Sequence, residues 1–141
     1  MAWTPVAHSN SEYMDLSLDR DRGLARMRRS ERSITLGTAP LVIQRFTQDL
    51  ERLIPNATRR SFRLLVDSRE APRADPELES TLSGQMNPLM MQFACVAILI
   101  KTPIGILQMR RLLRGWGTPA DVFSDEAEAI IWLLRHPIAA P

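Results

Sequence analysis

The segment that most constrains the fold is an unbroken apolar run, FACVAILI, at residues 93–100. The run contains no polar alternation, and Lys101-Thr102-Pro103 follows it directly. A strand that is apolar on both faces is typical of the interior of a parallel sheet, with helices covering both sides. The run therefore predicts a central buried strand, for which the rest of the chain must supply neighbouring strands and covering helices.

Strands and helices alternate around this central strand. Alternating apolar residues at 12–19 and 24–29, joined by a turn at Gly23, predict an antiparallel hairpin. Further strands are expected at 62–67 and 120–123. Helices are expected to begin at residues that can cap them, which are Thr38, Asp75, Thr102 and Ser124. The order β-β-α-β-α-β-α-β-α predicts an α/β fold with a mixed five-stranded sheet, in which right-handed βα units follow the hairpin.

The second predicted helix contains Asn87-Pro88. A proline in a helix interior costs about 3 kcal/mol or ends the helix. The apolar residues nevertheless keep to one face on both sides of the proline; they are Leu78, Leu82, Met86, Leu89 and Phe93. We therefore expect a kinked or briefly interrupted helix whose apolar face stays in phase.

The length and composition predict one domain. A chain of 141 residues can bury a core without disulfides or metal. Residues 1–11 and 137–141 lack periodicity and are expected to be tails around a domain at 12–136. Cys95 is the one cysteine, which excludes an internal disulfide and favours a reducing compartment. The segment MAWTPVAHSN lacks signal-peptide features, and no run reaches the roughly 20 apolar residues of a membrane span, so we expect a cytoplasmic protein.

No set of residues has the pattern of a catalytic or metal site. Nucleophilic catalysis needs a serine or cysteine beside a base, but His8 lies in the expected tail and His136 at the end of a helix. Cys95 lies inside the central strand, where cysteine normally acts as a small hydrophobe. Acidic residues at 70–79 are typical of a helix cap and a solvated face. We therefore predict no enzyme activity, no metal and no cofactor.

Three segments carry a resemblance to a known family: FRLLVDSRE at 62–70, FACVAILI at 93–100 and ADVFSDEAEAIIWL at 120–133. In element order and strand endings the chain from Glu12 to about Arg135 resembles the STAS family of anti-sigma-factor-antagonist-like domains, and more closely its divergent STAS-like members. The resemblance implies a sequential βα superhelix around a mixed sheet. It also implies binding of protein partners in regulation or signalling, with nucleotide or lipid-like ligands in some members.

The resemblance singles out one serine. In signalling members of the family, a partner kinase phosphorylates a serine directly after the third strand, and Ser68 follows Asp67 at the corresponding point. Phosphate suits the free N–H groups of a helix start. Here Arg69 and Glu70 replace the family's small residues and glycine, and the next helix begins later. The alternative is an ordinary serine at a strand end.

Arginines are concentrated in the hairpin, at positions 20, 22, 26, 28, 29 and 32. They are able to bind nucleic-acid phosphates or to prevent an edge strand from pairing with another chain. Alternation places Arg26 and Arg28 on the face of Leu24, and Arg29 with Met27 on the other. Because acidic residues are interspersed and the net charge is only +2, the pattern favours edge protection over nucleic-acid binding.

Three features are candidates for a protein interface. For the arginines of the third helix the alternative is a solvated face, and for the methionines of the second helix it is gap-filling in the core. Arg110, Arg111 and Arg114 lie opposite the apolar stripe of the third helix, and Met91 points away from that of the second. Trp132 lies opposite the predicted buried face of the last helix, and an exposed tryptophan is a typical interface anchor. It could instead pack beneath the C-terminal residues. The residues predicted to form that buried face are Ala127, Ile130, Ile131 and Leu134.

The sequence leaves three functions open. The leading hypothesis is a non-catalytic STAS-like module that docks a protein partner, or a second copy of itself, through its second and third helices and Trp132. The second is binding of a small anionic or lipid-like ligand by Arg69, Arg73 and the helix start at Thr102. Open α/β sheets take ligands at the carboxyl ends of their strands. The third is nucleic-acid binding by the hairpin arginines.

Overall fold

The computed structural model describes residues 7–73 and 75–138. Its sheet has the strand order β1-β2-β3-β4-β5-β6, so each strand lies beside the next one in the chain. The strands are β1 (Ala7–Asn10), β2 (Met14–Asp19), β3 (Leu24–Arg29), β4 (Arg63–Asp67), β5 (Val96–Leu99) and β6 (Ala120–Phe123). The helices are α1 (Ala39–Leu53), the short 3-10 helix η1 (Asn56–Ser61), α2 (Pro76–Met90), α3 (Pro103–Leu113) and α4 (Glu126–Leu134).

The predicted fold class is confirmed. Strands β2 and β3 form the antiparallel hairpin, and β3 to β6 run parallel. The predicted central strand is β5, in which every residue is buried. The sheet has one strand more than the five predicted, because β1 forms in the segment expected as a tail and pairs with β2. The predicted tails also include Ser11, Pro137 and Ile138, which the structure describes, and residues 1–6 and 139–141, which lie outside the described residues.

The hairpin forms as predicted, but it does not leave an arginine-rich edge. Gly23 has φ +59°, a left-handed conformation that only glycine adopts without cost, and it turns the chain from β2 into β3. β3 lies between β2 and β4, and β1 covers the other side of β2. The edge-protection interpretation of the hairpin arginines is therefore wrong, because neither hairpin strand is an edge.

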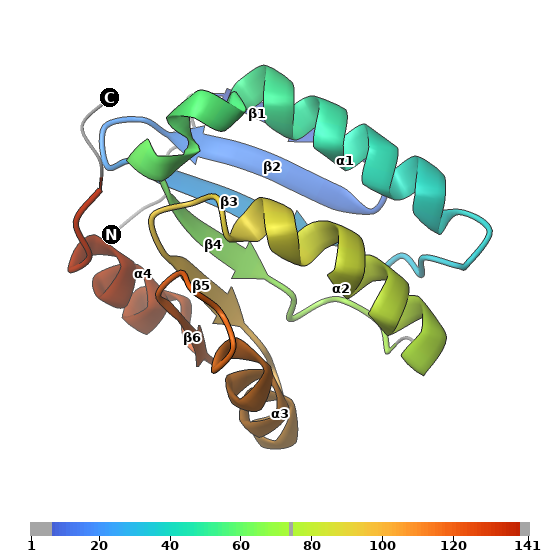
Figure 1. Ribbon diagram of the computed structural model, residues 1–141. Helices are drawn as coiled ribbons and strands as arrows, with labels where there is room; N and C mark the ends of the chain where they lie inside the picture. Colours follow the sequence, from blue (N-terminus) through green and yellow to red (C-terminus); the bar gives the residue numbers. More distant parts are fainter. Residues whose placement is uncertain (1–6, 74, 139–141) are drawn as a thin grey trace.

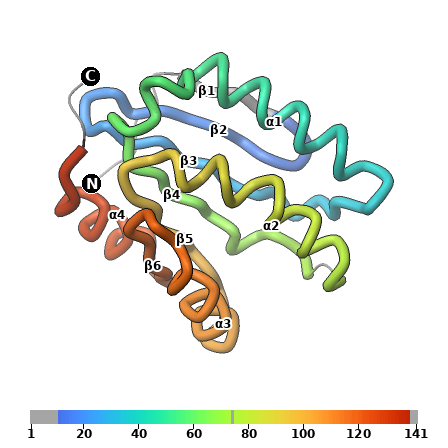
Figure 2. The backbone as a smooth tube through the Cα atoms, viewed as in Figure 1, coloured from blue at the N-terminus to red at the C-terminus, as the bar shows by residue number. Residues whose placement is uncertain are grey.

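The helices cover the two faces of the sheet unequally (Figures 1 and 2). Helices α1, α2 and α3 lie over one face, whereas α4 lies over the other. Alternate strand residues divide between two cores. The larger core joins strands to the first three helices through residues such as Leu16, Met27, Val66, Phe46, Leu82 and Leu113. The smaller core joins strands to α4 through residues such as Leu24, Leu65, Leu99, Ile130 and Leu133.

Two of the predicted caps form with their side chains. The Asp75 carboxylate accepts a hydrogen bond from the N–H of Leu78 at 2.9 Å. The Thr102 hydroxyl accepts one from the N–H of Gly105 at 3.1 Å. These bonds satisfy backbone donors that a helix start leaves free. They fix where α2 and α3 begin.

Helix α2 runs through Pro88 as one element, without the predicted interruption. The proline lies in the last turn, where its missing N–H removes one bond close to the end of the helix. Leu78, Leu82 and Met86 are all buried. The apolar face therefore stays in phase, as predicted.

Helix α4 buries a different face from the one predicted. Ala129, Ile130 and Leu133 are buried, whereas Ile131 is 52% exposed. The N-cap is Asp125, one residue after the predicted Ser124. Apolar residues occupy almost every position of this helix, so its sequence period does not define which side faces the sheet.

Candidate functional site

A network of ion pairs lies beside β3 and the carboxyl end of β4, on the face covered by α4. Arg69 donates its Nε to Asp67 Oδ1 at 3.0 Å and its Nη2 to Asp67 Oδ2 at 2.9 Å. Arg26 donates to the same carboxylate at 3.2 Å and pairs with Glu126 at 2.9 Å. Two guanidinium groups and two carboxylates thus neutralise one another. The network holds β3, β4 and α4 together.

The ionisation of Asp67 reflects this pairing. Burial by itself raises the pKa of the Asp67 carboxyl. Hydrogen bonds from the side chain and backbone of Arg69, the charge of Arg69 and a hydrogen bond from Arg26 outweigh that effect, so the pKa of Asp67 lies below its ordinary value. The side-chain hydrogen bond to Asp67 in turn raises the pKa of Arg69. Both groups are therefore charged at neutral pH.

Two of the three residues predicted to bind an anion already have partners within the protein. Arg69 holds Asp67 through two side-chain hydrogen bonds. The Thr102 hydroxyl caps α3. Arg73 is exposed in the loop before α2. The strand ends thus bring Asp67 and Arg69 together, but as a structural pair.

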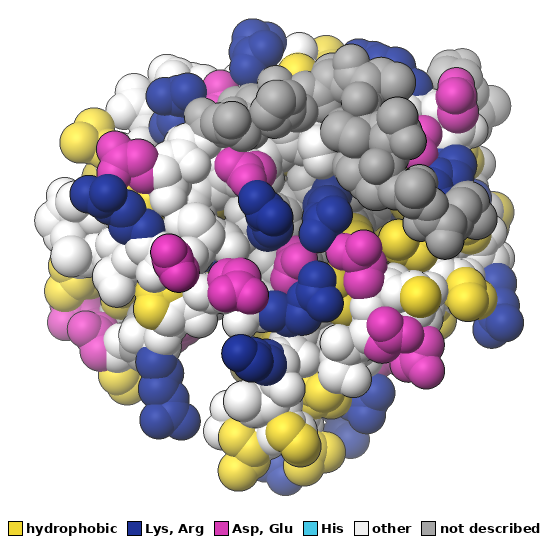
Figure 3. All heavy atoms as spheres, turned by 180° about the vertical axis from the view of Figure 1, so that it is seen from behind, with side chains coloured by type: hydrophobic (Ala, Val, Ile, Leu, Met, Phe, Trp, Pro, Cys, Tyr) yellow, Lys and Arg dark blue, Asp and Glu magenta, His cyan; other side chains and the backbone are white. Residues whose placement is uncertain are grey.

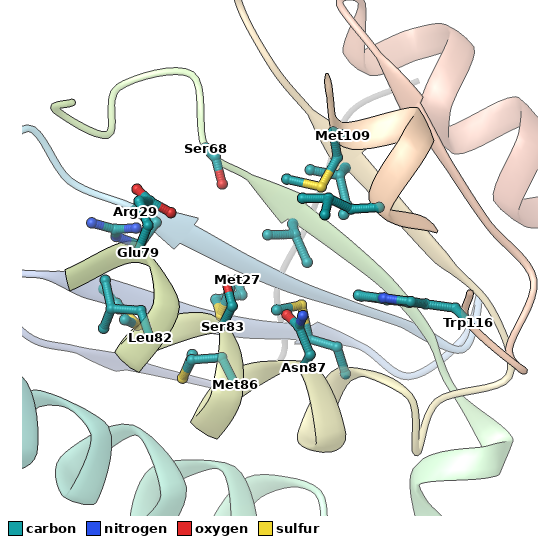
Figure 4. A pocket seen from close by; sticks show the side chains of 15 residues that line it. Met27, Arg29, Ser68, Glu79, Leu82, Ser83, Met86, Asn87, Met109 and Trp116 are labelled. Carbon is teal, nitrogen blue, oxygen red and sulfur yellow. The ribbon is translucent and has the colours of Figure 1, made fainter. Parts of the chain in front are cut away.

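Ser68 lies directly after β4, and its N–H donates to the carbonyl of Leu99 at 3.1 Å. Its side chain is half-buried and points toward α2 and α3, not away from the domain (Figure 4). Helix α2 begins only at Pro76, beyond the intervening loop. A phosphate on Ser68 would therefore lack the free N–H groups of a helix start, and phosphorylation of Ser68 stays a prediction.

Most hairpin arginines form ion pairs with neighbouring acidic residues. These pairs join Arg22 to Asp19 at 2.7 Å, Arg28 to Asp15 at 2.8 Å and Arg32 to Glu12 at 2.9 Å. Each pair cancels charge that a nucleic-acid surface would need to present to phosphates. The arrangement does not favour the nucleic-acid hypothesis.

The residues predicted for a partner interface divide between opposite faces of the sheet. Met91 ends α2, and its carbonyl accepts a hydrogen bond from the Thr118 hydroxyl at 2.8 Å. Trp132 lies on α4, where its ring centroid is 5.7 Å from that of Phe123 and 4.2 Å from that of His136. The predicted position of Trp132 opposite the buried face is wrong, because it is half-buried within the α4 layer. Met91 and Trp132 therefore cannot belong to one patch.

Helix α3 presents an outer face that is both apolar and basic. Ile104, Leu107 and Leu112 are 63%, 58% and 65% exposed. Arg111 and Arg114 are exposed beside them, and neither has a hydrogen bond or ion pair among the residues that the structure describes. Figure 3 shows hydrophobic side chains gathered at the foot of the molecule, where α3 lies. We call these five residues the outer face of α3.

Arg110 differs from the other two arginines of α3. It pairs with Asp121 at 3.4 Å and donates to the carbonyl of Val122 at 3.3 Å. These contacts join α3 to β6. Arg110 therefore has a structural partner, whereas Arg111 and Arg114 are exposed and have none among the described residues.

A cavity of about 120 Å³ lies between α2 and α3, above the sheet (Figure 4). Apolar side chains from the sheet and both helices form most of its wall. They are Met14, Met27, Val66, Ile98, Leu82, Met86, Met90, Met109, Leu112 and Trp116. Arg29 and Glu79 lie at one end of the cavity with Ser68 nearby, whereas Met109 and Trp116 lie at the other. The cavity therefore has charged side chains at one end and apolar side chains at the other.

The described residues contain no group of three or more His, Cys, Asp and Glu side chains that could hold a metal ion. The buried thiol of Cys95 lies 3.9 Å from the Leu133 carbonyl. Burial raises the pKa of this thiol to about 11, and the charge of Arg63 opposes the shift only in part. A cysteine in that state is protonated at neutral pH and is not a reactive nucleophile. Within the described part of the chain, no helix is both long enough and apolar enough to cross a bilayer.

A solved structure identifies the fold. It is the crystal structure of an uncharacterized DUF3478-family protein from Shewanella loihica PV-4, described as having a SpoIIAA-like fold. The alignment covers 94% of this chain and 99% of that chain, with a TM-score of 0.64. The chain has a SpoIIAA-like, or STAS-like, fold. The two sequences are 15% identical, so the likeness concerns the fold alone. Neither the models of known protein families nor the curated proteins contain a match to this STAS-like chain.

Proposed function

We propose that this STAS-like domain is a non-catalytic binding module that docks an acidic protein partner on the outer face of α3. The observation that carries the proposal is the exposure of Ile104, Leu107 and Leu112 beside Arg111 and Arg114, two arginines that have no acceptor among the described residues. Apolar anchors and arginine are the groups enriched at the centres of protein interfaces. The surface therefore has the composition of a docking site.

Charge indicates what the partner must present. Helix α3 contains no acidic residue from Pro103 to Leu113. A guanidinium group accepts a carboxylate in a bidentate pair, with a geometry that lysine does not offer. A partner segment that carries carboxylates around an apolar strip would therefore match Arg111 and Arg114 as well as the leucines.

The arrangement of side chains on α3 favours a protein over a membrane surface. A helix that lies in a lipid interface carries basic and apolar residues on opposite faces. On α3, helical spacing places Arg111 between Ile104 and Leu107 on the same face. A protein segment can present carboxylates to the arginines and apolar side chains to the apolar residues at the same time. Anionic lipid and a second copy of this chain are the competing occupants.

The first experiment compares binding by two matched variants. Leu107→Ser removes an apolar anchor from α3, where Leu107 is 58% exposed, and Leu41→Ser removes a leucine of α1 that is 69% exposed. A partner captured from the native cell extract is purified and titrated against each variant. We expect Leu107→Ser and Arg111→Glu to weaken binding by about tenfold or more, whereas Leu41→Ser stays within twofold.

Two further measurements exclude the competing occupants. Light scattering should give the mass of a monomer, 16.0 kDa, at all concentrations. Vesicles of phosphatidylglycerol should not sediment the protein. A dimer that Leu107→Ser dissociates, vesicle binding that requires Arg111, or equal partner affinity for all variants would each contradict docking of an acidic protein.

A further inference from the structure

We infer that the cavity between α2 and α3 binds a small amphiphilic carboxylate. The carboxylate would pair with Arg29 and the apolar chain would lie among the methionines. This site is distinct from the strand-end residues Arg69 and Thr102. It shares only Leu112 with the outer face of α3, so the inference goes beyond the docking function proposed above.

Arg29 supplies the charge. It is the last residue of β3, and its side chain lies on the α2 face of the sheet. Arg28 is in register with Asp67, which places Arg29 level with Ser68 on the next rung. Both therefore lie at the carboxyl edge of the parallel strands, where open α/β sheets take ligands.

The guanidinium group of Arg29 has an unused donor. Its Nε is buried and has no hydrogen-bond partner among the described residues, and the side chain has no ion pair there either. Burial lowers the pKa of Arg29, and the charge of Glu79 offsets this only in part. A buried donor without an acceptor is unfavourable. An acceptor in the cavity beside the guanidinium group would offset the cost of burying its charge.

The surrounding groups favour a monocarboxylate over a phosphate. Nε–H and the adjacent Nη–H form the edge of the guanidinium that takes a carboxylate in two parallel bonds. The Ser68 hydroxyl lines the same cavity and offers a further donor. Arg29 is the one cationic side chain among the described residues that line the cavity, and the Glu79 carboxylate beside it disfavours a ligand with a second negative charge. A ligand with a single charge therefore fits best.

The apolar part of the cavity sets the size of the chain. An engineered cavity of about 150 Å³ holds a benzene ring, so about 120 Å³ accepts a small ring or a short alkyl chain. Five of the lining residues are methionines, whose flexible side chains adapt to different shapes. Leu112 lines the cavity and is 65% exposed, so a longer chain can reach the surface there.

Calorimetric titration of the full chain with octanoate tests the inference. We expect octanoate to bind and to raise the melting temperature. Acetate, which lacks the chain, and octylammonium, which reverses the charge, should do neither. Octyl phosphate should bind more weakly than octanoate. These four probes separate the contribution of the charge from that of the apolar chain.

Three variants locate the site. Arg29→Gln should weaken octanoate binding by about tenfold or more, because it removes a charge-assisted hydrogen bond. Arg28→Gln is the matched control on the opposite face of the same strand, where the Arg28 side chain is 52% exposed, and it should stay within twofold. Ser83→Leu fills the cavity from α2 with a better helix former, so it should abolish binding in a folded protein.

Several results would overturn the inference. They are no binding of octanoate by the wild type, equal affinity for Arg29→Gln and the wild type, or full binding by Ser83→Leu. Equal stabilisation by octylammonium would show that charge plays no part. Tighter binding of octyl phosphate would contradict the assignment to a carboxylate. Circular dichroism and the melting temperature show whether each variant is folded before it is titrated.

Discussion

The arginines on the two faces of the sheet differ in whether they form ion pairs. On the α4 face, Arg26 and Arg69 are paired with Asp67 and Glu126. On the α2 face, Arg29 stands at the end of an apolar cavity and has no ion pair among the described residues. A buried Nε without a hydrogen-bond partner is common to Arg26 and Arg29, so the ion pairs make the difference. These groups lie close together along the same sheet edge. Strand alternation alone separates them.

This difference shows why charge near a strand end does not by itself identify a binding site. A guanidinium group that already has two carboxylates has little to gain from a third. One that is partly buried without an acceptor is improved by a ligand. The unpaired group, rather than the most highly charged cluster, is therefore the better indicator of a binding site in this domain.

The largest expected effect on stability comes from removing the ion pairs on the α4 face. Asp67→Asn removes the charge that holds Arg69 and Arg26, and it should lower the free energy of unfolding by about 2–3 kcal/mol. Glu79→Gln makes the same chemical change on the opposite face, at an exposed residue, and should change it by less than about 0.5 kcal/mol. Urea unfolding of both variants measures the difference. Equal losses would show that the two faces are not distinct.

Replacing one arginine on each face should change the free energy of unfolding by a smaller amount, and in opposite directions for the two faces. Arg26→Met leaves Asp67 and Glu126 with less compensation, so it should lower the free energy of unfolding by about 1–2 kcal/mol. Arg29→Met removes a partly buried charge whose burial the charge of Glu79 offsets only in part, and it should raise the free energy of unfolding by up to about 1 kcal/mol. A clear destabilisation by Arg29→Met would mean that Arg29 has a structural role.

The smallest effect concerns pH. Because the pKa of Asp67 is lower in the folded protein, this carboxylate contributes stability above its unfolded pKa, about 3.9. That contribution is lost as the pH falls through the lower folded value. Between pH 5 and pH 2 the wild type should therefore lose more stability than Asp67→Asn. Parallel curves in chemical unfolding would contradict the pairing.

The sequence predicted the features that depend on local patterns. Alternation in β3 correctly placed Arg26 and Arg28 on one face and Arg29 on the other. The caps at Asp75 and Thr102 follow from residue type and position alone. The unbroken apolar run correctly identified β5 as the interior strand. These features require no knowledge of distant neighbours.

The features that were not predicted depend on contacts between distant segments. β1 forms because β2 offers it a partner, and its own sequence has no strand pattern. The buried face of α4 is selected by the sheet, because Ile130 and Ile131 are equally apolar. The Arg69–Asp67 pair depends on the path of a loop. The cavity exists because α2 and α3 begin where they do, which no single segment encodes.

Nitrogen-detected magnetic resonance of the arginine Nε–H groups tests the difference between the faces most directly. In the free protein, the Nε–H of Arg69 donates to Asp67 and should exchange slowly with water. Octanoate should shift the Arg29 signal and slow its exchange, while the Arg69 signal stays unchanged. A shift of the Arg69 signal, or no change at Arg29, would contradict the assignment of Arg29 as the group available to a ligand.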